Sequence, residues 1–327
     1  MTIKIINSLL AVVYGVGGAI VLYWLLNKLT DLFPRRTHER VKPYVFILPA
    51  FAAISIYLLY PFVQTVVLSF ANRDSTAWVG FDNYTSLLGN QAFRGTLFNT
   101  LLWILIVPAL SIVLGLLIAT LTDRLRPGGE KFTKTIIFLP LAISAVGAGA
   151  IWRFVYTARP PGQEQIGLLN AVWTRLGGEP VAWLSLSTAH LNSLLLMAIL
   201  VWTQAGFAMV LLSAAIKGVP GDTLEAARID GAAEGRIFFA IIVPQIRTTI
   251  ITVFITVLIG VLKTFDIVYV MTNGNFNTNV IALSYYQQAF VNRNAGFAAA
   301  IVVMLMVVMV PIMTYQVRQF RAQEATR

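Results

Sequence analysis

Long apolar stretches are the feature that most constrains how this chain can fold. About 20 apolar residues in a helix cross a hydrocarbon core of roughly 30 Å, and seven stretches here reach that length. Inside lipid every backbone N–H and C=O needs an internal partner, so each stretch is expected to be a helix. The predicted spans are 8–26, 44–70, 97–121, 135–156, 191–216, 246–271 and 295–315.

The share of charged residues is too low for a soluble protein. Only 12% of the 327 residues are charged and 57% are hydrophobic, whereas a soluble domain has about 25% charged residues. The chain is therefore predicted to be an all-α integral membrane protein. It has no cysteine and only two histidines, which argues against disulfides and against thiolate or histidine metal sites. No loop combines its net charge of +10 with aromatic residues, so no nucleic-acid partner is expected.

Most of the basic residues near the first apolar stretch, such as Lys28, Arg35 and Arg36, follow it. A signal peptide has the opposite order, with a basic region ahead of a shorter apolar core. We therefore expect an uncleaved span with its N-terminus outside; a cleaved signal peptide is the alternative. Residues 1–43 would form an extra N-terminal helix with a cytoplasmic linker, and residues 44–327 the main transmembrane domain.

Lys and Arg indicate the orientation of the spans, because cytoplasmic loops of membrane proteins carry an excess of them. With seven spans, the N-terminus outside and the C-terminus inside, most of the 24 Lys and Arg residues fall in cytoplasmic loops. This topology places the polar segment 220–244 in the cytoplasm. The other predicted connections are a polar loop at 73–94, a Gly-Gly turn before the fourth span, an exterior loop at 157–189 with a helix at 166–176, and an exterior segment at 273–294 with a helix at 281–290.

The segment 220–244 is a long charged run between two predicted spans. Asp222 is a good N-cap, and Glu225 stands three positions later, where its carboxylate can reach back to the cap amide. A short helix is therefore predicted to begin near Thr223. Gly231 should end it, because glycine adopts the left-handed conformation without a Cβ clash. A second helical piece is expected to begin at 232–234 and to lead into the next span at Pro244.

This segment resembles the cytoplasmic EAA loop of permease subunits in binding-protein-dependent ABC importers. The resemblance rests on Glu225-Ala226-Ala227, on Gly231 and on Pro244, within VPGDTLEAARIDGAAEGRIFFAIIVPQ. In that family the loop is a coupling helix that inserts into a groove of a separate ATPase. The alternative is an ordinary amphipathic helix between two spans. The residues assigned to ATPase coupling are Leu224, Glu225, Ala226, Ala227, Ile229, Asp230, Gly231 and Pro244, with Phe238 as a further apolar anchor.

Further segments resemble the carbohydrate branch of these permeases, in particular its α-glucoside-type members. They are WVGFDNYTSLL, GLLNAVWTRLGGEPVAW and KTFDIVYVMTNG, and the likeness covers about residues 8 to 320. It implies a type I importer permease in the bacterial plasma membrane, with one helix added to a six-helix core. It also implies a second homologous permease, an ABC ATPase homodimer, an extracellular or periplasmic sugar-binding protein, and an α-glucoside or a glucosylglycerol-like osmolyte as substrate.

The chain contains no phosphate-loop motif of the form G-x-x-x-x-G-K-[ST]. ATP and Mg²⁺ are therefore expected on a partner ATPase, and the chain is not expected to be an enzyme or to hold a cofactor. One alternative is an ion-coupled secondary transporter that uses Asp266, although an ion pair with Lys263 on the same helix face is the preferred role of that residue. Another is a membrane glycosyltransferase, which would need paired acidic residues that the loops do not offer.

A sugar pathway is implied beside the coupling loop, in the fifth and sixth spans. Aromatic rings there can stack on sugar faces, and amides or hydroxyls can bond to sugar hydroxyls. Simple packing of Trp202 and Phe207 against neighbouring helices is the alternative, and Arg153 in the fourth span is expected to reach toward the outer interface. The candidate pathway residues are Leu200, Trp202, Thr203, Gln204, Phe207, Gly260, Thr264 and Asp266, with Val257 and Val261 as apolar neighbours.

Overall fold

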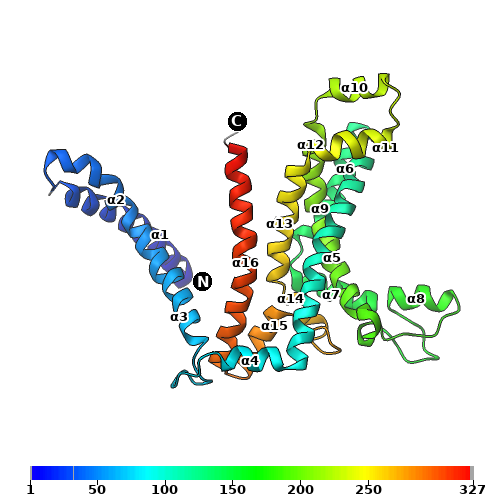
Figure 1. The fold of residues 1–327 in the computed structure, drawn as a ribbon, viewed down its shortest axis with the longest axis horizontal. Coiled ribbons are helices and arrows are strands. Elements are labelled where there is room, and N and C mark those ends of the chain that lie inside the picture. Colours follow the sequence, from blue (N-terminus) through cyan, green and yellow to red (C-terminus); the bar gives the residue numbers. More distant parts are fainter. Residues whose placement is uncertain (1, 32, 325–327) are drawn as a thin grey trace. The chain divides into compact units, whose positions relative to one another are not determined.

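The computed structural model of the chain describes residues 2–31 and 33–324 and is helical almost throughout (Figure 1). Within those residues the only β-type pairing is one isolated bridge between Ala71 and Trp78. In the described part of the chain, five helices are long and apolar enough to cross a membrane, and the number rises to seven if each of two bent pairs counts as one span. The expectation of an all-α membrane protein is confirmed. The chain divides into two compact units, residues 1–67 and residues 68–327.

The first unit contains the first two predicted spans. Helix α1 runs over Thr2–Thr30, and α2 (Arg35–Ile54) continues through a π-helical turn, Ser55–Leu59, toward α3 (Tyr60–Leu68). The wide turn lies just before Pro61, where a regular helix would bring the proline ring against the carbonyl four residues earlier. The side chains of the apolar windows stay exposed within the chain, as expected for helices that contact lipid or another subunit.

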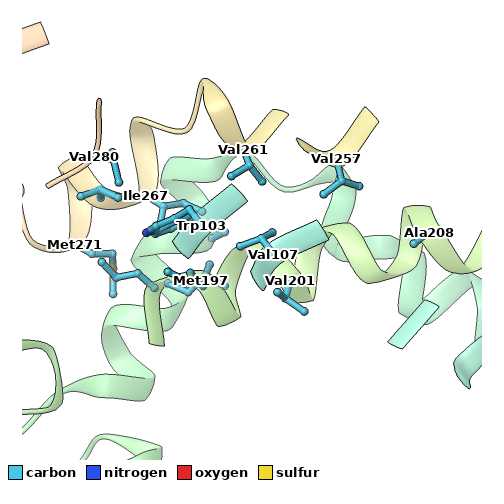
Figure 2. Packing of buried hydrophobic residues seen from close by; sticks show 14 of the residues in the cluster. Trp103, Val107, Met197, Val201, Ala208, Val257, Val261, Ile267, Met271 and Val280 are labelled. Atoms are coloured by element: carbon cyan, nitrogen blue, oxygen red, sulfur yellow. The ribbon is translucent and has the colours of Figure 1, made fainter. Parts of the chain in front are cut away.

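The core of the second unit is built on α5 (Gln91–Thr122) and α9 (Leu191–Lys217), with α13 (Arg247–Leu262) packed against both. Trp103 and Val107 of α5 lie beside Met197 of α9 in a continuous apolar cluster (Figure 2). At Gly115 the two long helices approach so closely that an added Cβ would lie 2.7 Å from the Ala208 Cβ. Small residues at such a crossing allow the backbone contact that holds membrane helices together.

Helix α16 (Ala295–Glu324) is the seventh predicted span and packs against two short helices, α4 (Asp82–Gly89) and α15 (Ile281–Tyr286). The helix expected at 281–290 is confirmed, since a π-helical turn extends α15 to Val291. The polar loop predicted at 73–94 is partly wrong because it contains α4. Asn83 of α4 is buried and donates to the carbonyls of Ser69 and Ala71, at 2.8 Å each, which holds α4 against the preceding turn.

The fourth predicted span is broken. It consists of α6 (Pro127–Phe138), a 3₁₀ turn (Leu139–Ala142) and α7 (Ala145–Tyr156), with a bend of 104°. Pro140 has no N–H to continue the helix, and the extended Ser144 starts α7 by accepting a bond from the Gly147 amide. The predicted Gly-Gly turn is also wrong, because both glycines lie in the first turn of α6.

The sixth predicted span is broken twice. The first break lies at its start, where the helical piece that leads into it, made of α11 (Glu234–Ile237), a π-helical turn (Phe238–Ile242) and α12 (Val243–Gln245), meets α13 at a bend of 70°. After Leu262 the chain leaves the helix and restarts as α14 (Asp266–Met271). The predicted ion pair between Lys263 and Asp266 is wrong, since no ion pair joins them in the described residues. The break removes the helical spacing that would have put both on one face.

The loop 157–189 contains α8 (Leu168–Arg175), which confirms the helix expected at 166–176. Asn170 is fully buried and bonds to three parts of the loop: its amide donates to the Thr157 and Val181 carbonyls, and its oxygen accepts from Val181 N and Trp183 Nε1. One side chain thus fixes the loop, because each of these groups would otherwise be left without a partner.

Candidate functional site

Helix α10 (Gly221–Ile229) lies across the end of the second unit, next to α11 and beyond the ends of α9 and α12 (Figure 1). Pro220 is its N-cap, and no side chain caps the helix. The prediction that Asp222 is the N-cap and that Glu225 reaches back to it is therefore wrong. Gly221 is already helical, so Asp222 falls in the first turn, where its carboxylate still lies near the positive end of the helix dipole.

The predicted stop at Gly231 is confirmed. Its φ is +77°, in the left-handed region that glycine adopts at low cost. The Gly231 amide donates to the Arg228 carbonyl and the Ala232 amide to the Ala227 carbonyl, both at 3.0 Å. These two bonds form the Schellman motif, which satisfies the last carbonyls of a helix. The turn after α10 is thus defined by backbone geometry that depends on one glycine.

An ion pair that the sequence analysis missed closes this turn. Arg228 Nε donates to Glu234 Oε1 at 2.8 Å, linking the end of α10 to the start of α11. The hydrogen bond and negative charge of Glu234 raise the pKa of Arg228 above its usual value. Both side chains are more than half exposed, so the pair fixes the angle between the short helices more than it stabilises the fold.

The outer surface of α10 is open, and no residue of the helix is fully buried. Ile229 is 86% exposed, the largest exposed fraction among the large apolar side chains of the described residues. Leu224 and Ala227 are half-buried on the face toward the rest of the chain, while Glu225, Ala226 and Asp230 are exposed. Pro244 lies in α12, apart from this surface. The geometry presents an apolar side chain surrounded by charges, as a docking helix would.

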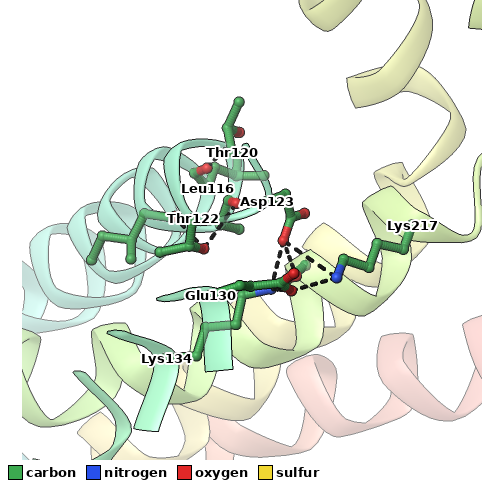
Figure 3. A network of polar contacts seen from close by, with 10 residues as sticks. Leu116, Thr120, Thr122, Asp123, Glu130, Lys134 and Lys217 are labelled. Carbon is green, nitrogen blue, oxygen red and sulfur yellow. Dashed lines mark hydrogen bonds and ion pairs between the residues drawn. The ribbon is translucent and has the colours of Figure 1, made fainter. Parts of the chain in front are cut away.

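The sequence analysis missed a group of polar and charged side chains that connects the C-terminal ends of α5 and α9 to the N-terminal part of α6. This polar cluster consists of Asp123, which follows α5, Glu130 and Lys134 of α6, and Ser213 and Lys217 of α9 (Figure 3). Lys134 Nζ lies 2.5 Å from Asp123 Oδ1 and 2.6 Å from Glu130 Oε1. Lys217 bonds to the same Glu130 oxygen. Only the folded structure brings these residues together.

The candidate pathway residues of α9 have different environments. Trp202 packs edge-on against Trp152, with 5.8 Å between ring centroids, and borders an apolar cavity of about 580 Å³ between α5, α6 and α9. Thr203 is buried and donates to the Leu200 carbonyl at 2.9 Å. Leu200 and Phe207 pack against the core. Gln204 is half-buried and has no polar contact among the described residues. The two aromatic residues therefore contribute to packing.

The candidates after the coupling loop are more accessible. Gly260 and Asp266 are exposed within the chain, and Thr264 is half-buried with its hydroxyl 3.5 Å from the Gly260 carbonyl. Val257 and Val261, in contrast, are buried in the core (Figure 2). The guanidinium of Arg153, which was predicted to reach toward the outer interface, donates to the Val270 carbonyl of α14. It ties the two broken spans together.

Comparison with known proteins identifies the chain. The family model described as "Binding-protein-dependent transport system inner membrane component" matches residues 87–322. The chain belongs to this family. This permease is therefore a multi-pass inner membrane protein, as the sequence predicted.

Two relatives are similar over most of their length. The permease is 45% identical to the alpha-glucoside transport system permease protein AglF of Rhizobium meliloti (strain 1021), over 96% of this chain and 97% of that protein. It is 47% identical to the osmoprotective compounds uptake permease protein GgtC of Synechocystis sp., over 86% of this chain and 100% of that protein. Its fold matches a chain in the crystal structure of a bacterial ABC transporter involved in the import of alginate, with a TM-score of 0.74, 21% identity and coverage of 88% and 99%.

The permease fold gathers most of the predicted coupling residues on one helix, α10, and spreads the predicted pathway residues over α9, α13 and α14. The first group lies together because its residues come from one local motif. The sequence analysis missed the polar cluster and the Arg228–Glu234 pair, because apart from Glu130 and Lys134, four residues apart on α6, their members are separated by turns or by whole spans. Acidic and basic residues at the ends of consecutive spans were the only available signal for the cluster.

Proposed function

We propose that this permease forms the translocation pathway of an ATP-driven importer for α-glucosides or a glucosylglycerol-like osmolyte. The substrate class is supported by its similarity to AglF, named for α-glucoside transport, and to GgtC, named for uptake of osmoprotective compounds. The proposed partners are a second homologous permease, an ABC ATPase homodimer and an extracellular or periplasmic binding protein. ATP and Mg²⁺ bind the ATPase, and this chain carries no catalytic group of its own.

The observation that carries the proposal is the open α10 surface. A helix held by short connections, ended by a left-handed glycine and presenting an 86% exposed isoleucine is suited to docking in a groove. We place α10 in the cytoplasm, with the N-terminus of the chain outside and its C-terminus inside. Closure of the ATPase dimer on ATP then displaces α10, and the helices connected to it open the pathway outward.

The proposed pathway runs along α9, α13 and α14. Gln204 offers an amide without a polar partner in the described residues, and Thr264 and Asp266 are accessible groups that can bond to sugar hydroxyls. Gly260 leaves open space beside them, since nothing lies within 4 Å of an added Cβ. Leu200, Trp202, Thr203 and Phe207 complete the set and act by shaping the apolar wall.

Photo-cross-linking at Ile229 tests the coupling role. With the photoreactive residue p-benzoylphenylalanine at Ile229, we expect irradiation of the assembled transporter to attach the permease to its ATPase. The same substitution at Leu176 is the control, because that side chain is 77% exposed but lies in the exterior loop. No ATPase adduct at Ile229, or equal labelling at both positions, would contradict the assignment.

A solute panel tests the substrate class. In proteoliposomes that contain the whole transporter and its binding protein, we expect α-glucosides or glucosylglycerol to raise ATP hydrolysis severalfold, since substrate-loaded binding proteins shift the equilibrium between transporter states. Pentoses and glycerol 3-phosphate should leave hydrolysis at its unstimulated rate. Stimulation by the latter solutes and not by glucosides would overturn the substrate class.

A further inference from the structure

We propose that the polar cluster is the positioning device that joins the coupling helix α10 to the broken span α6–α7. The inference rests on the proposed function, because it assigns to α10 a movement that the ATPase drives. In this arrangement the end of α9 is fixed to α6 by charge, so a displacement of α10 is passed to α6 and through the 104° bend to α7.

The contacts make the cluster one unit rather than a set of separate pairs. Lys134 is shared by Asp123 and Glu130, at 2.5 and 2.6 Å, and it also contacts the Ser213 hydroxyl. That hydroxyl donates to Asp123 Oδ1 at 2.8 Å. Lys217 bonds to Glu130 and lies 3.9 Å from Asp123 Oδ1. Two carboxylates and two ammonium groups balance in charge, so a movement of any one helix disturbs contacts to the other two (Figure 3).

Burial shows why the cluster is more than a stabilising feature. The side chains of Asp123, Glu130 and Lys134 are only 15%, 19% and 17% exposed. Ion pairs of partly exposed groups add little to stability, and apolar packing of the same volume is often at least as stable as a buried pair. Three partly buried charges and the half-exposed Lys217 are therefore better explained by the fixed geometry that they impose on the helices than by added stability.

The position of the cluster links it to α10. Lys217 is the last residue of α9, and only residues 218–220 separate it from α10. That link is short and bonded: the Gly218 amide donates to the Ala214 carbonyl at 3.2 Å, the Val219 amide donates to the Ile216 carbonyl at 3.1 Å, and the Val219 side chain is buried. A displacement of α10 should therefore move Lys217 as well, because the link between them is short and held by hydrogen bonds.

Lys217 is the movable member of the cluster and Lys134 the fixed one. The Lys217 side chain is 52% exposed, whereas Lys134 is held by three partners. Asp123 Oδ2 is buried and has no hydrogen-bond partner among the described residues, so it can accept one more donor. A shift of the end of α9 would let Lys217 exchange Glu130 for Asp123 without losing a charged partner. The cluster can thus hold α9 against α6 in two positions.

The test measures sugar uptake for each ATP hydrolysed by the whole transporter in proteoliposomes. Lys217→Met and the double variant Asp123→Asn with Lys134→Met should each lower this ratio about tenfold, within the usual range of coupling energies between sites. The double variant removes one acid and one base, which avoids a buried charge without a partner. Lys134→Arg should keep most of the ratio because it keeps the charge. Lys131→Met is the matched control, since Lys131 lies on α6 but is exposed and outside the cluster.

A wild-type ratio in Lys217→Met and in the double variant would overturn the inference. So would an equal fall of uptake and hydrolysis that follows the amount of assembled complex, because that result would show a purely structural role. The Ile229 probe separates this inference from the proposed function. If Ile229 labels the ATPase while the cluster variants behave like Lys131→Met, the proposed function stands and the positioning role is wrong.

Discussion

Replacing Gly231 by valine should uncouple ATP hydrolysis from uptake. At φ +77° a side chain with a Cβ clashes with its own backbone, which costs roughly 1–2 kcal/mol for an ordinary residue and more for a β-branched one. The strain would be relieved by breaking the two Schellman bonds, and α10 would lose its fixed angle to α11. We expect uptake to fall at least about tenfold, a loss of coupling within the usual range.

The space around Gly231 makes this result specific. Nothing lies within 4 Å of a Cβ added there, so the substitution strains the backbone without disturbing any packing, and the permease should still assemble. Gly231→Asn should retain part of the uptake, because asparagine tolerates the left-handed region. Gly235→Val is the matched control: it has the same open space and an ordinary φ. Uptake at the wild-type level in Gly231→Val, or an equal loss in Gly235→Val, would contradict the backbone argument.

The coupling loop was predictable because its signals are local. The acidic and alanine-rich motif Glu225-Ala226-Ala227 and the glycine that ends the helix, Gly231, lie within a few residues of one another, and Pro244 follows on the same segment. The error at Asp222 was also local, because the helix begins at Gly221, two residues before the predicted Thr223. Capping propensity locates the first residue of a helix only to within about one or two positions.

The broken spans and the polar cluster could not be predicted from local sequence signals. Hydropathy records how apolar a stretch is, and a bend of 104° leaves it unchanged. Pro140 was visible, but prolines are also common in continuous membrane helices, and α16 contains Pro311 without a break. In the cluster, Lys217 is 87 residues from Glu130, and the contact exists only because α9 packs against α6.

A substitution at Gly206 should also have a large effect, because α6 and α9 pack closely there. A Cβ added to this residue would lie 2.4 Å from the Ile137 carbonyl oxygen and 2.9 Å from the Phe138 Cα. Both are backbone atoms, so no side chain can rotate away. The neighbouring Ala205 and Ala208 are buried, which keeps α9 from turning. Gly206→Val should therefore force the two helices apart at the start of the bend.

We expect Gly206→Val to lower the stability of the permease by at least the roughly 1–3 kcal/mol typical of an overpacked core. The amount of assembled transporter in membranes should fall severalfold, and the thermal midpoint of the purified complex should fall by several degrees. Gly206→Ala should show a smaller change in the same direction. Gly18→Val in α1 is the control, because nothing lies within 4 Å of the added Cβ. Normal yield and midpoint in Gly206→Val would mean that α6 and α9 are not in backbone contact there, and the rigid connection between the polar cluster and the broken span would lose its basis.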